Sequence, residues 1–210
     1  MSIDLHKQAG SDKGCSAVIY DSFEHRRHGY YAFVDWPGGL YCSAAFRGSS
    51  NGGLVAVAWA TLLAKGRAEL KENALRLHRG VKALRQQITE RVAECEVLGE
   101  PIACGVAFQF SGSLKGCDYA VAEALEEVGG WEMVRLQFPS SLFFQASQQW
   151  IEGVDQLVVD LQSAAKLVRA HPEKYKKSGM AGIYGTAAVF PDRGLVAETC
   201  YQYLDIIHTP

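Results

Sequence analysis

Residues 2–14 read Ser-Ile-Asp-Leu-His-Lys-Gln-Ala-Gly-Ser-Asp-Lys-Gly, and they are the most informative part of the chain. His6 directly precedes Lys7, a second lysine (Lys13) follows six residues after Lys7, and residues 16–20 form an apolar run. Such a run is typical of a strand. A lysine amine becomes nucleophilic only when it is partly desolvated or lies near other cations, and Lys13 supplies such a charge. The pattern indicates a loop with a reactive Lys7 before a strand, although an isolated loop lysine is usually just a solvated charge.

The composition is that of an ordinary globular protein. The 210 residues are 48% hydrophobic and 21% charged, and the net charge is -2. These values fit one or two domains with a core and give no indication of nucleic acid as a partner. The longest apolar run, residues 54–64, is shorter than the about 20 residues that span a bilayer. The six cysteines contain no C-x-x-C pair. They are predicted to be reduced and mostly buried, Cys42 and Cys200 among them, with no metal site.

Periodicity predicts the elements of the first half. Residues 16–20 and 30–34 are expected to be strands, the first of them buried, and residues 36–53 a glycine-rich loop. Such a loop either lets backbone amides approach a ligand or a neighbouring subunit, or simply connects two elements. A helix apolar on nearly all sides, and therefore expected to be buried, should follow residue 53. Beyond Gly66, apolar residues at intervals of three and four predict an amphipathic helix to residue 88.

The second half has a different order of elements, which indicates a separate α+β unit. The predicted elements are strands at 94–98 and 103–110, a helix at 119–128, strands at 131–138 and 142–147, and a helix at 150–168 that ends before His171-Pro172. We therefore expect two domains, 1–94 and 95–210.

Five further motifs follow the lysine stretch along the chain. They are DWPGGLY at 35–41, GSSNGG at 48–53, LQFP at 136–139, GMAGIYG at 179–185, and DR with VAE between 192 and 198. Their identity, order and spacing resemble the sphingosine-1-phosphate lyase family over essentially the whole chain. The resemblance implies an α/β fold of fold type I among the pyridoxal-phosphate enzymes. Residues 1–94 would end the large cofactor domain, and residues 95–210 would form the small domain.

The same resemblance implies a function and roles for six residues. The expected reaction is carbon–carbon cleavage of phosphorylated long-chain bases to a fatty aldehyde and phosphoethanolamine, with pyridoxal 5'-phosphate as cofactor. Lys7 would bond covalently to the cofactor, His6 would lie beside its phosphate, and Lys13 would contact a phosphate or the reacting centre. Tyr184 would donate a hydrogen bond or a proton to the substrate. Gly48 and Ser49 would approach the cofactor phosphate of the partner subunit in a homodimer.

Purely structural roles remain possible for two of these residues and for one neighbour. Tyr184 could be a packed turn residue, and His6 could merely orient the loop. Asp4 is expected to hydrogen-bond the loop backbone rather than to face the cofactor.

The chain also departs from the family pattern. The family reads H-K-Y-G-x-A-P-K-G where residues 6–14 read HKQAGSDKG, and Ser50 and Asn51 replace an arginine and a proline. These changes put the choice of substrate in doubt more than the cofactor chemistry. The family's ring-stacking histidine, pyridine-binding aspartate and phosphate-cupping loop precede the lysine, so this chain is expected to be inactive alone.

Two other functions remain open. A group II amino-acid decarboxylase shares the His-Lys pair, although motifs 35–41 and 179–185 argue against it. A truncated chain that only dimerises with a relative is the non-catalytic alternative. The expected location is cytoplasmic, with the cytosolic face of the endoplasmic reticulum for a full-length eukaryotic form.

Overall fold

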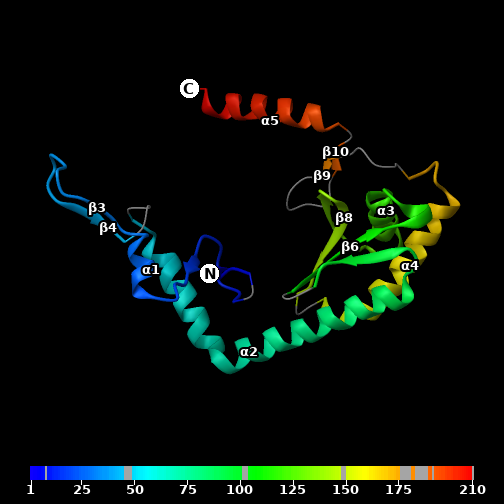
Figure 1. The fold of residues 1–210 in the computed structure, drawn as a ribbon, viewed down its shortest axis with the longest axis horizontal. Coiled ribbons are helices and arrows are strands. Elements are labelled where there is room, and N and C mark those ends of the chain that lie inside the picture. Colours follow the sequence, from blue (N-terminus) through cyan, green and yellow to red (C-terminus); the bar gives the residue numbers. More distant parts are fainter. Residues whose placement is uncertain are drawn as a thin grey trace. The chain divides into compact units, whose positions relative to one another are not determined.

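The structure is a computed structural model, and it describes residues 1–7, 9–44, 49–100, 104–147, 150–175, 181–182, 189–190 and 192–209. The chain divides into two compact units, Met1–Ala74 and Leu75–Pro210. The division falls within helix α2 (Gly52–Arg91), which is interrupted at Gly66 as predicted. The boundary expected at residue 95 is the first residue of strand β5 (Cys95–Leu98), and it stays a prediction. Figure 1 shows the elements of both units.

The first unit contains two small antiparallel sheets. In one, β1 (Ser2–Asp4) pairs with β2 (Ser16–Val18), and in the other, β3 (Tyr31–Phe33) pairs with β4 (Tyr41–Ser43). The short helix α1 (Phe23–Arg27) lies between them along the chain. Strands therefore occur in both segments where the sequence predicts them. Each sheet has only two strands, which is marginal for independent stability in water.

The first unit buries little of its apolar surface. Of its described residues, only Ser11 and Ala58 are buried. Trp59 is 64% exposed and Leu63 is 61% exposed, so the prediction of a buried helix after residue 53 was wrong. Residues 18–20 are exposed as well, against the expected buried strand. The hydrophobic content of a segment indicates an apolar surface, but it does not show whether other parts of the same chain pack against that surface.

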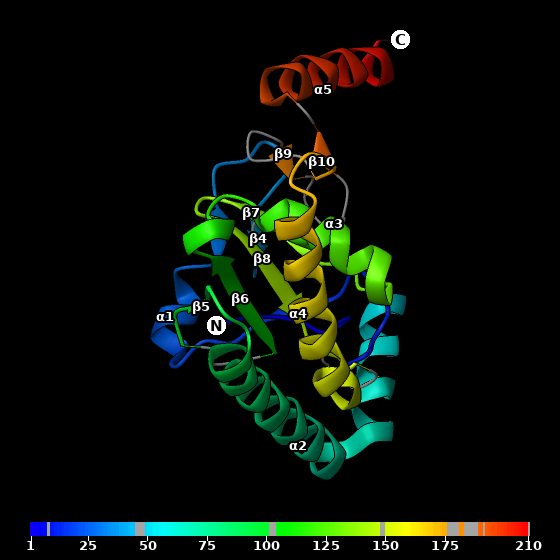
Figure 2. The same ribbon diagram turned by 90° about the vertical axis from the view of Figure 1, so that its right-hand side faces the viewer.

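The second unit is a four-stranded antiparallel sheet with helices on one face. The strands β5, β6 (Gly105–Phe110), β8 (Ser140–Gln145) and β7 (Val134–Gln137) lie in that order. Along β6 the residues alternate between partly buried and fully buried, as expected for a sheet covered on one side. Helices α3 (Asp118–Gly129) and α4 (Val154–Ala170) pack against each other beside this sheet (Figure 2).

The remaining elements of the second unit are short, apart from the last helix. They are the 3₁₀ turns η1 (Gly112–Leu114) and η2 (Ile151–Gly153), the strands β9 (Ala181–Gly182) and β10 (Val189–Phe190), and helix α5 (Arg193–His208).

The core of the second unit confirms the predicted helical stripe. Leu77, Val81, Leu84 and Ile88 of α2 are buried in one cluster with residues of α3, α4 and the sheet. The α3 helix ends where two glycines follow one another, and Gly130 adopts a left-handed conformation with φ of 69°. This conformation lets its N–H group reach the carbonyl oxygen of Glu126 and cap the helix.

All six cysteines are free, as expected, but only one of them is buried, three are partly buried and two are exposed. Cys42 and Cys200 are exposed, whereas Cys117 is buried in the second unit. The apolar neighbours of Cys42 and Cys200 in the sequence are themselves exposed, so the burial expected for these two was wrong. Within the described ranges, no helix is both long and apolar enough to cross a bilayer.

Candidate active site

The Lys7 loop, residues 5–15, connects β1 to β2 and is closed by its own backbone. The N–H of Lys7 donates to the carbonyl of Asp4 at 3.2 Å, and the N–H of Gly10 donates to the carbonyl of Lys7 at 3.3 Å. The N–H of Ser11 donates back to the carbonyl of Leu5 at 3.1 Å. Two successive turns thus place Lys7 at an exposed position between two anchored strands. His6, Lys7 and Lys13 all lie in this loop, as the motif predicts.

Asp4 holds the amine of Lys7 in this structure. Its Oδ2 atom lies 3.1 Å from Lys7 Nζ, and its Oδ1 atom accepts a hydrogen bond from Ser16 Oγ at 2.9 Å. The hydrogen bond from Ser16, followed by that from Lys7, lowers the pKa of the Asp4 carboxyl. Asp4 is bonded to the loop backbone through its carbonyl oxygen, which accepts from the N–H of Lys7, whereas its carboxylate contacts the two side chains.

Two polar atoms next to Lys7 are buried without a partner. They are Nδ1 of His6 and Oγ of Ser11, for which the described part of the chain offers no hydrogen-bond partner. Ser11 as a whole is only 8% exposed. Buried polar atoms are normally paired, so unpaired ones beside a lysine fit a loop that binds a polar group from outside the described residues.

Lys65 of α2 approaches the same loop and was not predicted from the sequence. Its Nζ donates to the carbonyl oxygen of Ala9 at 2.7 Å. A Cβ atom added to Gly10 would lie 2.5 Å from Lys65 Nζ, and Gly10 has φ of 70°, so this position requires glycine. The sequence signal was a lysine directly after the apolar run 54–64, but nothing in the pattern pairs that position with residue 9.

The other predicted site residues are only partly accounted for. Lys13 and Ser49 are exposed. Gly48 and Tyr184 lie outside the described residues.

Two of the motifs far apart in the sequence meet in the second unit. Motif 136–139 spans the end of β7 and the turn into β8, and Nε2 of Gln137 donates to the carbonyl oxygen of Gly182 at 3.2 Å. Gly182 belongs to motif 179–185. A Cβ atom at Gly182 would lie 2.5 Å from the carbonyl oxygen of Arg135, so the close approach of β9 to β7 depends on this glycine. Motif 35–41 forms the β3–β4 hairpin instead, where the N–H of Gly39 donates to the carbonyl of Trp36 at 2.9 Å.

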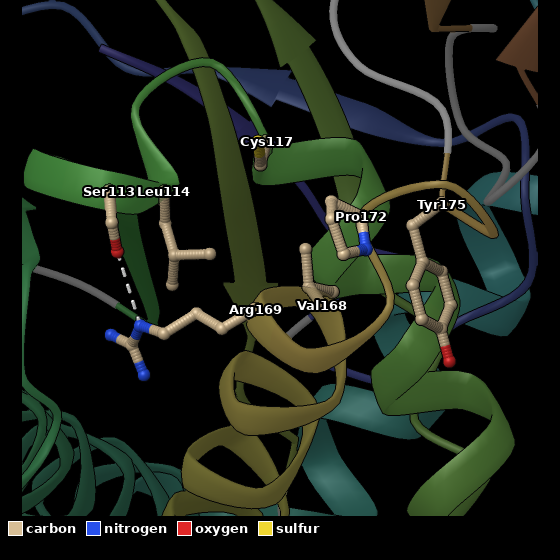
Figure 3. A pocket seen from close by; sticks show the side chains of 7 residues that line it. All are labelled: Ser113, Leu114, Cys117, Val168, Arg169, Pro172 and Tyr175. Atoms are coloured by element: carbon tan, nitrogen blue, oxygen red, sulfur yellow. Dashed lines mark hydrogen bonds between the residues drawn. The ribbon is translucent and has the colours of Figure 1, made fainter.

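A pocket of about 300 Å³ lies elsewhere, in the second unit (Figure 3). Its lining residues are Ser113, Leu114, Cys117, Val168, Arg169, Pro172 and Tyr175. None of them is a predicted site residue. The guanidinium of Arg169 already binds the carboxylate of Glu94 at 2.8 Å, and the hydroxyl of Tyr175 donates to Glu127 at 3.0 Å. Since its polar groups are already paired, this pocket has weaker features of an active site than the Lys7 loop.

Comparison with known proteins gives a consistent picture. No family model matches the chain. The chain is 35% identical to the sphingosine-1-phosphate lyase of Arabidopsis thaliana, over 98% of this chain and 37% of that protein. It is 32% identical to the enzyme of that name from Dictyostelium discoideum, over 100% of this chain and 38% of the relative. It is 29% identical to sphingosine-1-phosphate lyase 1 of Rattus norvegicus, over 100% of this chain and 36% of that protein.

The fold has a solved counterpart. The structure of the sphingosine-1-phosphate lyase from Burkholderia pseudomallei superimposes with a TM-score of 0.72 at 24% identity, covering 99% of this chain and 41% of that one. This likeness confirms the predicted α/β fold class of fold type I. The matches fall in the carboxyl-terminal part of the relatives. The chain thus spans little more than a third of the length of the curated relatives that it matches, 37% in the first case.

Proposed function

From the homology of this chain to the carboxyl-terminal part of sphingosine-1-phosphate lyases, we propose that it forms part of a pyridoxal-phosphate-dependent carbon–carbon lyase. The proposed substrates are phosphorylated long-chain bases, and the products are a fatty aldehyde and phosphoethanolamine. The relatives that carry this name are matched over only 37% of their length in the first case. We therefore expect the 210 residues alone to show no turnover.

The Lys7 loop carries the proposal. It presents an exposed amine at Lys7, 53% exposed as a side chain, next to the unpaired buried atoms Nδ1 of His6 and Oγ of Ser11. These groups fit pyridoxal phosphate, because its aldehyde bonds to an amine and its phosphate accepts hydrogen bonds. Once bound, the cofactor supplies an electron-withdrawing ring that lets the carbon–carbon bond break.

The residues of the chain would hold and orient the reactants. Lys7 would leave the carboxylate of Asp4 and hold the cofactor through its amine. His6 would lie beside the cofactor phosphate, and Lys13 would neutralise a phosphate as a point charge. The hydroxyl of Tyr184 moves a proton at the reacting centre.

A homodimer would complete the site. In this arrangement Gly48 and Ser49 approach the cofactor phosphate of the partner subunit. The apolar side chains left exposed in the first unit, such as Trp59 and Val34, agree with an additional surface that covers them. We place the reaction in the cytoplasm, or on the cytosolic face of the endoplasmic reticulum for a eukaryotic protein.

An assay of products tests the function. The complete gene product, incubated with pyridoxal phosphate and sphinganine-1-phosphate, should release a long-chain aldehyde and phosphoethanolamine. The matched control is Lys7→Ala, which should release neither. Carbon dioxide from an amino acid, without aldehyde, would identify a decarboxylase. If the complete gene product binds a relative but has no turnover in either assay, the chain is a non-catalytic partner.

A further inference from the structure

Ser11 is a buried hydroxyl at a position where the family pattern has alanine. Its side-chain oxygen is buried and has no hydrogen-bond partner in the described part of the chain, and the residue is 8% exposed. Burying a hydroxyl without a hydrogen bond destabilises the folded state, and alanine would avoid this cost. A serine that is kept in such a position therefore points to a partner that the described residues do not supply.

The charges around Ser11 indicate that this partner is an anion. Lys65 Nζ lies 2.7 Å from the carbonyl oxygen of Ala9, two residues before Ser11. An ammonium group has three donors, so this bond leaves two for another acceptor. Lys7 and Lys13 lie in the same loop on either side of Ser11.

Two carboxylates oppose these cations. Asp4 is already engaged by Ser16 and Lys7, and Asp12 is exposed. The loop that contains Ser11, together with Lys65, therefore has more cationic groups than carboxylates, three against two.

We propose that Ser11 Oγ donates a hydrogen bond to a phosphate monoester bound at the Lys7 loop. The ammonium group of Lys65 is the second group that contacts this phosphate. This inference rests on the proposed function, and it adds two residues that the resemblance does not assign. The phosphate could come from the cofactor or from the substrate, and the two sources can be separated by experiment.

The proposal predicts opposite effects of one substitution on stability and on binding. In the ligand-free protein, Ser11→Ala removes an unsatisfied buried hydroxyl and should raise the unfolding temperature. With a phosphate monoester bound, the same substitution removes a hydrogen bond to a charged group. The affinity for that ligand should then fall by about 10- to 100-fold.

The experiment uses the complete gene product and four ligands in two pairs. Pyridoxal phosphate is compared with pyridoxal, and phosphoethanolamine with ethanolamine, by calorimetry on the wild type and Ser11→Ala. If Ser11→Ala weakens binding of pyridoxal phosphate alone, Ser11 contacts the phosphate of the cofactor. If it weakens binding of phosphoethanolamine alone, Ser11 contacts the phosphate of the substrate. Ser11→Cys introduces a thiol of similar size, which is only a weak hydrogen-bond donor. This variant should therefore show the same loss of affinity as Ser11→Ala.

Controls separate this inference from the function itself. Ser163→Ala removes a hydroxyl that is bonded within α4, and it should leave all four affinities unchanged. Lys65→Met should weaken binding of the same phosphorylated ligand as Ser11→Ala. If Ser11→Ala leaves every affinity unchanged, the Ser11 proposal is wrong, even when the wild type fixes pyridoxal phosphate on Lys7 and cleaves its substrate. A wild type that binds phosphoethanolamine through Ser11 but has no lyase turnover would overturn only the proposed function.

Discussion

The amine of Lys7 lies 3.1 Å from the carboxylate of Asp4, the residue that ends β1. Ser16 at the start of β2 donates to the other oxygen of this carboxylate at 2.9 Å, so the sheet and Lys7 share one anchor. The ion pair is exposed, and exposed pairs contribute little to stability. Little free energy is therefore needed to separate Lys7 from Asp4 for the proposed reaction, and Asp4 can keep its bond to Ser16 between the two strands.

Replacement of Lys7 tests the covalent site. In the complete gene product, Lys7→Ala should abolish both turnover and the visible absorbance of lysine-bound pyridoxal phosphate, because both need this amine. Borohydride reduction followed by peptide mass spectrometry locates the bound cofactor. Lys82→Ala, on the second unit, serves as a control and should keep the label. Cofactor fixed on Lys13 or Lys65 instead would show that the assignment of Lys7 is wrong.

Replacement of Lys13 tests recognition of phosphate. Lys13→Ala should weaken the response to phosphorylated ligands more than to their unphosphorylated counterparts, because a point charge acts on the phosphate alone. The ratio of kcat/KM values for the two substrate types measures this effect. In Lys13→Ala this ratio should also depend less on salt concentration than in the wild type. Lys115→Ala removes an exposed lysine of the second unit and provides the comparison. An equal loss for both substrate types would assign Lys13 to a role other than phosphate binding.

Replacement of Tyr184 tests proton transfer. Tyr184→Phe should retain the cofactor but slow cleavage by about 10²- to 10⁴-fold, since general acid–base groups contribute that much. Single-turnover kinetics separates the chemical step from binding. Tyr201→Phe, at a residue that is 65% exposed on α5, should have no effect. Unchanged kinetics for Tyr184→Phe would return this residue to the role of a packed turn residue.

Glu94 should make the second unit sensitive to acid. Its carboxylate binds Arg169 at 2.8 Å and accepts from the hydroxyl and N–H of Ser113, and these contacts lower its pKa from 4.5 to about 2. A lowered pKa stabilises the fold above pH 4.5, and this stabilisation is lost as the pH falls toward about 2. Glu94→Gln should therefore be less stable than the wild type at neutral pH, and the difference should shrink in acid.

Urea unfolding between neutral and acidic pH measures this difference. Glu132→Gln, at an exposed position, is the matched control and should show a smaller change. A difference between Glu94→Gln and the wild type that stays constant down to pH 2 would contradict the role given to these contacts.

Asp118 should give the stability of the second unit a pH dependence opposite to that of Glu94. This residue is only 2% exposed, and it accepts from the N–H of Phe110 at 2.8 Å and from the hydroxyl of Ser140 at 3.0 Å. Burial raises its pKa above the usual 3.8, despite the hydrogen bond from Phe110. A raised pKa means that the contribution to stability is largest below pH 3.8 and is lost as the pH rises through the raised value.

Two substitutions of Asp118 separate charge from hydrogen bonding. Asp118→Asn keeps an acceptor for Phe110 and should remove this pH dependence. Asp118→Ala leaves the buried N–H of Phe110 unpaired and should cost about 1–3 kcal/mol. Chemical unfolding of both variants over the same pH range checks this prediction. Equal stability of the two variants would show that the hydrogen bond to Phe110 contributes nothing.

Most of the local elements could be predicted from the sequence alone, which also singles out the Lys7 loop as the candidate site, an assignment that stays a prediction. Strands, helices and the break at Gly66 follow from periodicity and from glycine chemistry, which are properties of neighbouring residues. The stripe that contains Leu84 and Ile88 predicted the buried face of the second unit because every fourth or third residue of a helix shares one face. The His6-Lys7 motif likewise points to the loop, because the proposed covalent chemistry needs one residue type at one position.

Only the tertiary structure decided which residues distant in the sequence meet. Lys65 reaches the carbonyl of Ala9 across 56 positions, and Gln137 reaches Gly182 across 45. No local pattern encodes such pairs, because they depend on how separate elements pack. Burial in the first unit also depends on packing: Trp59 is apolar by sequence but exposed in the structure, because residue type alone does not decide which elements cover a side chain.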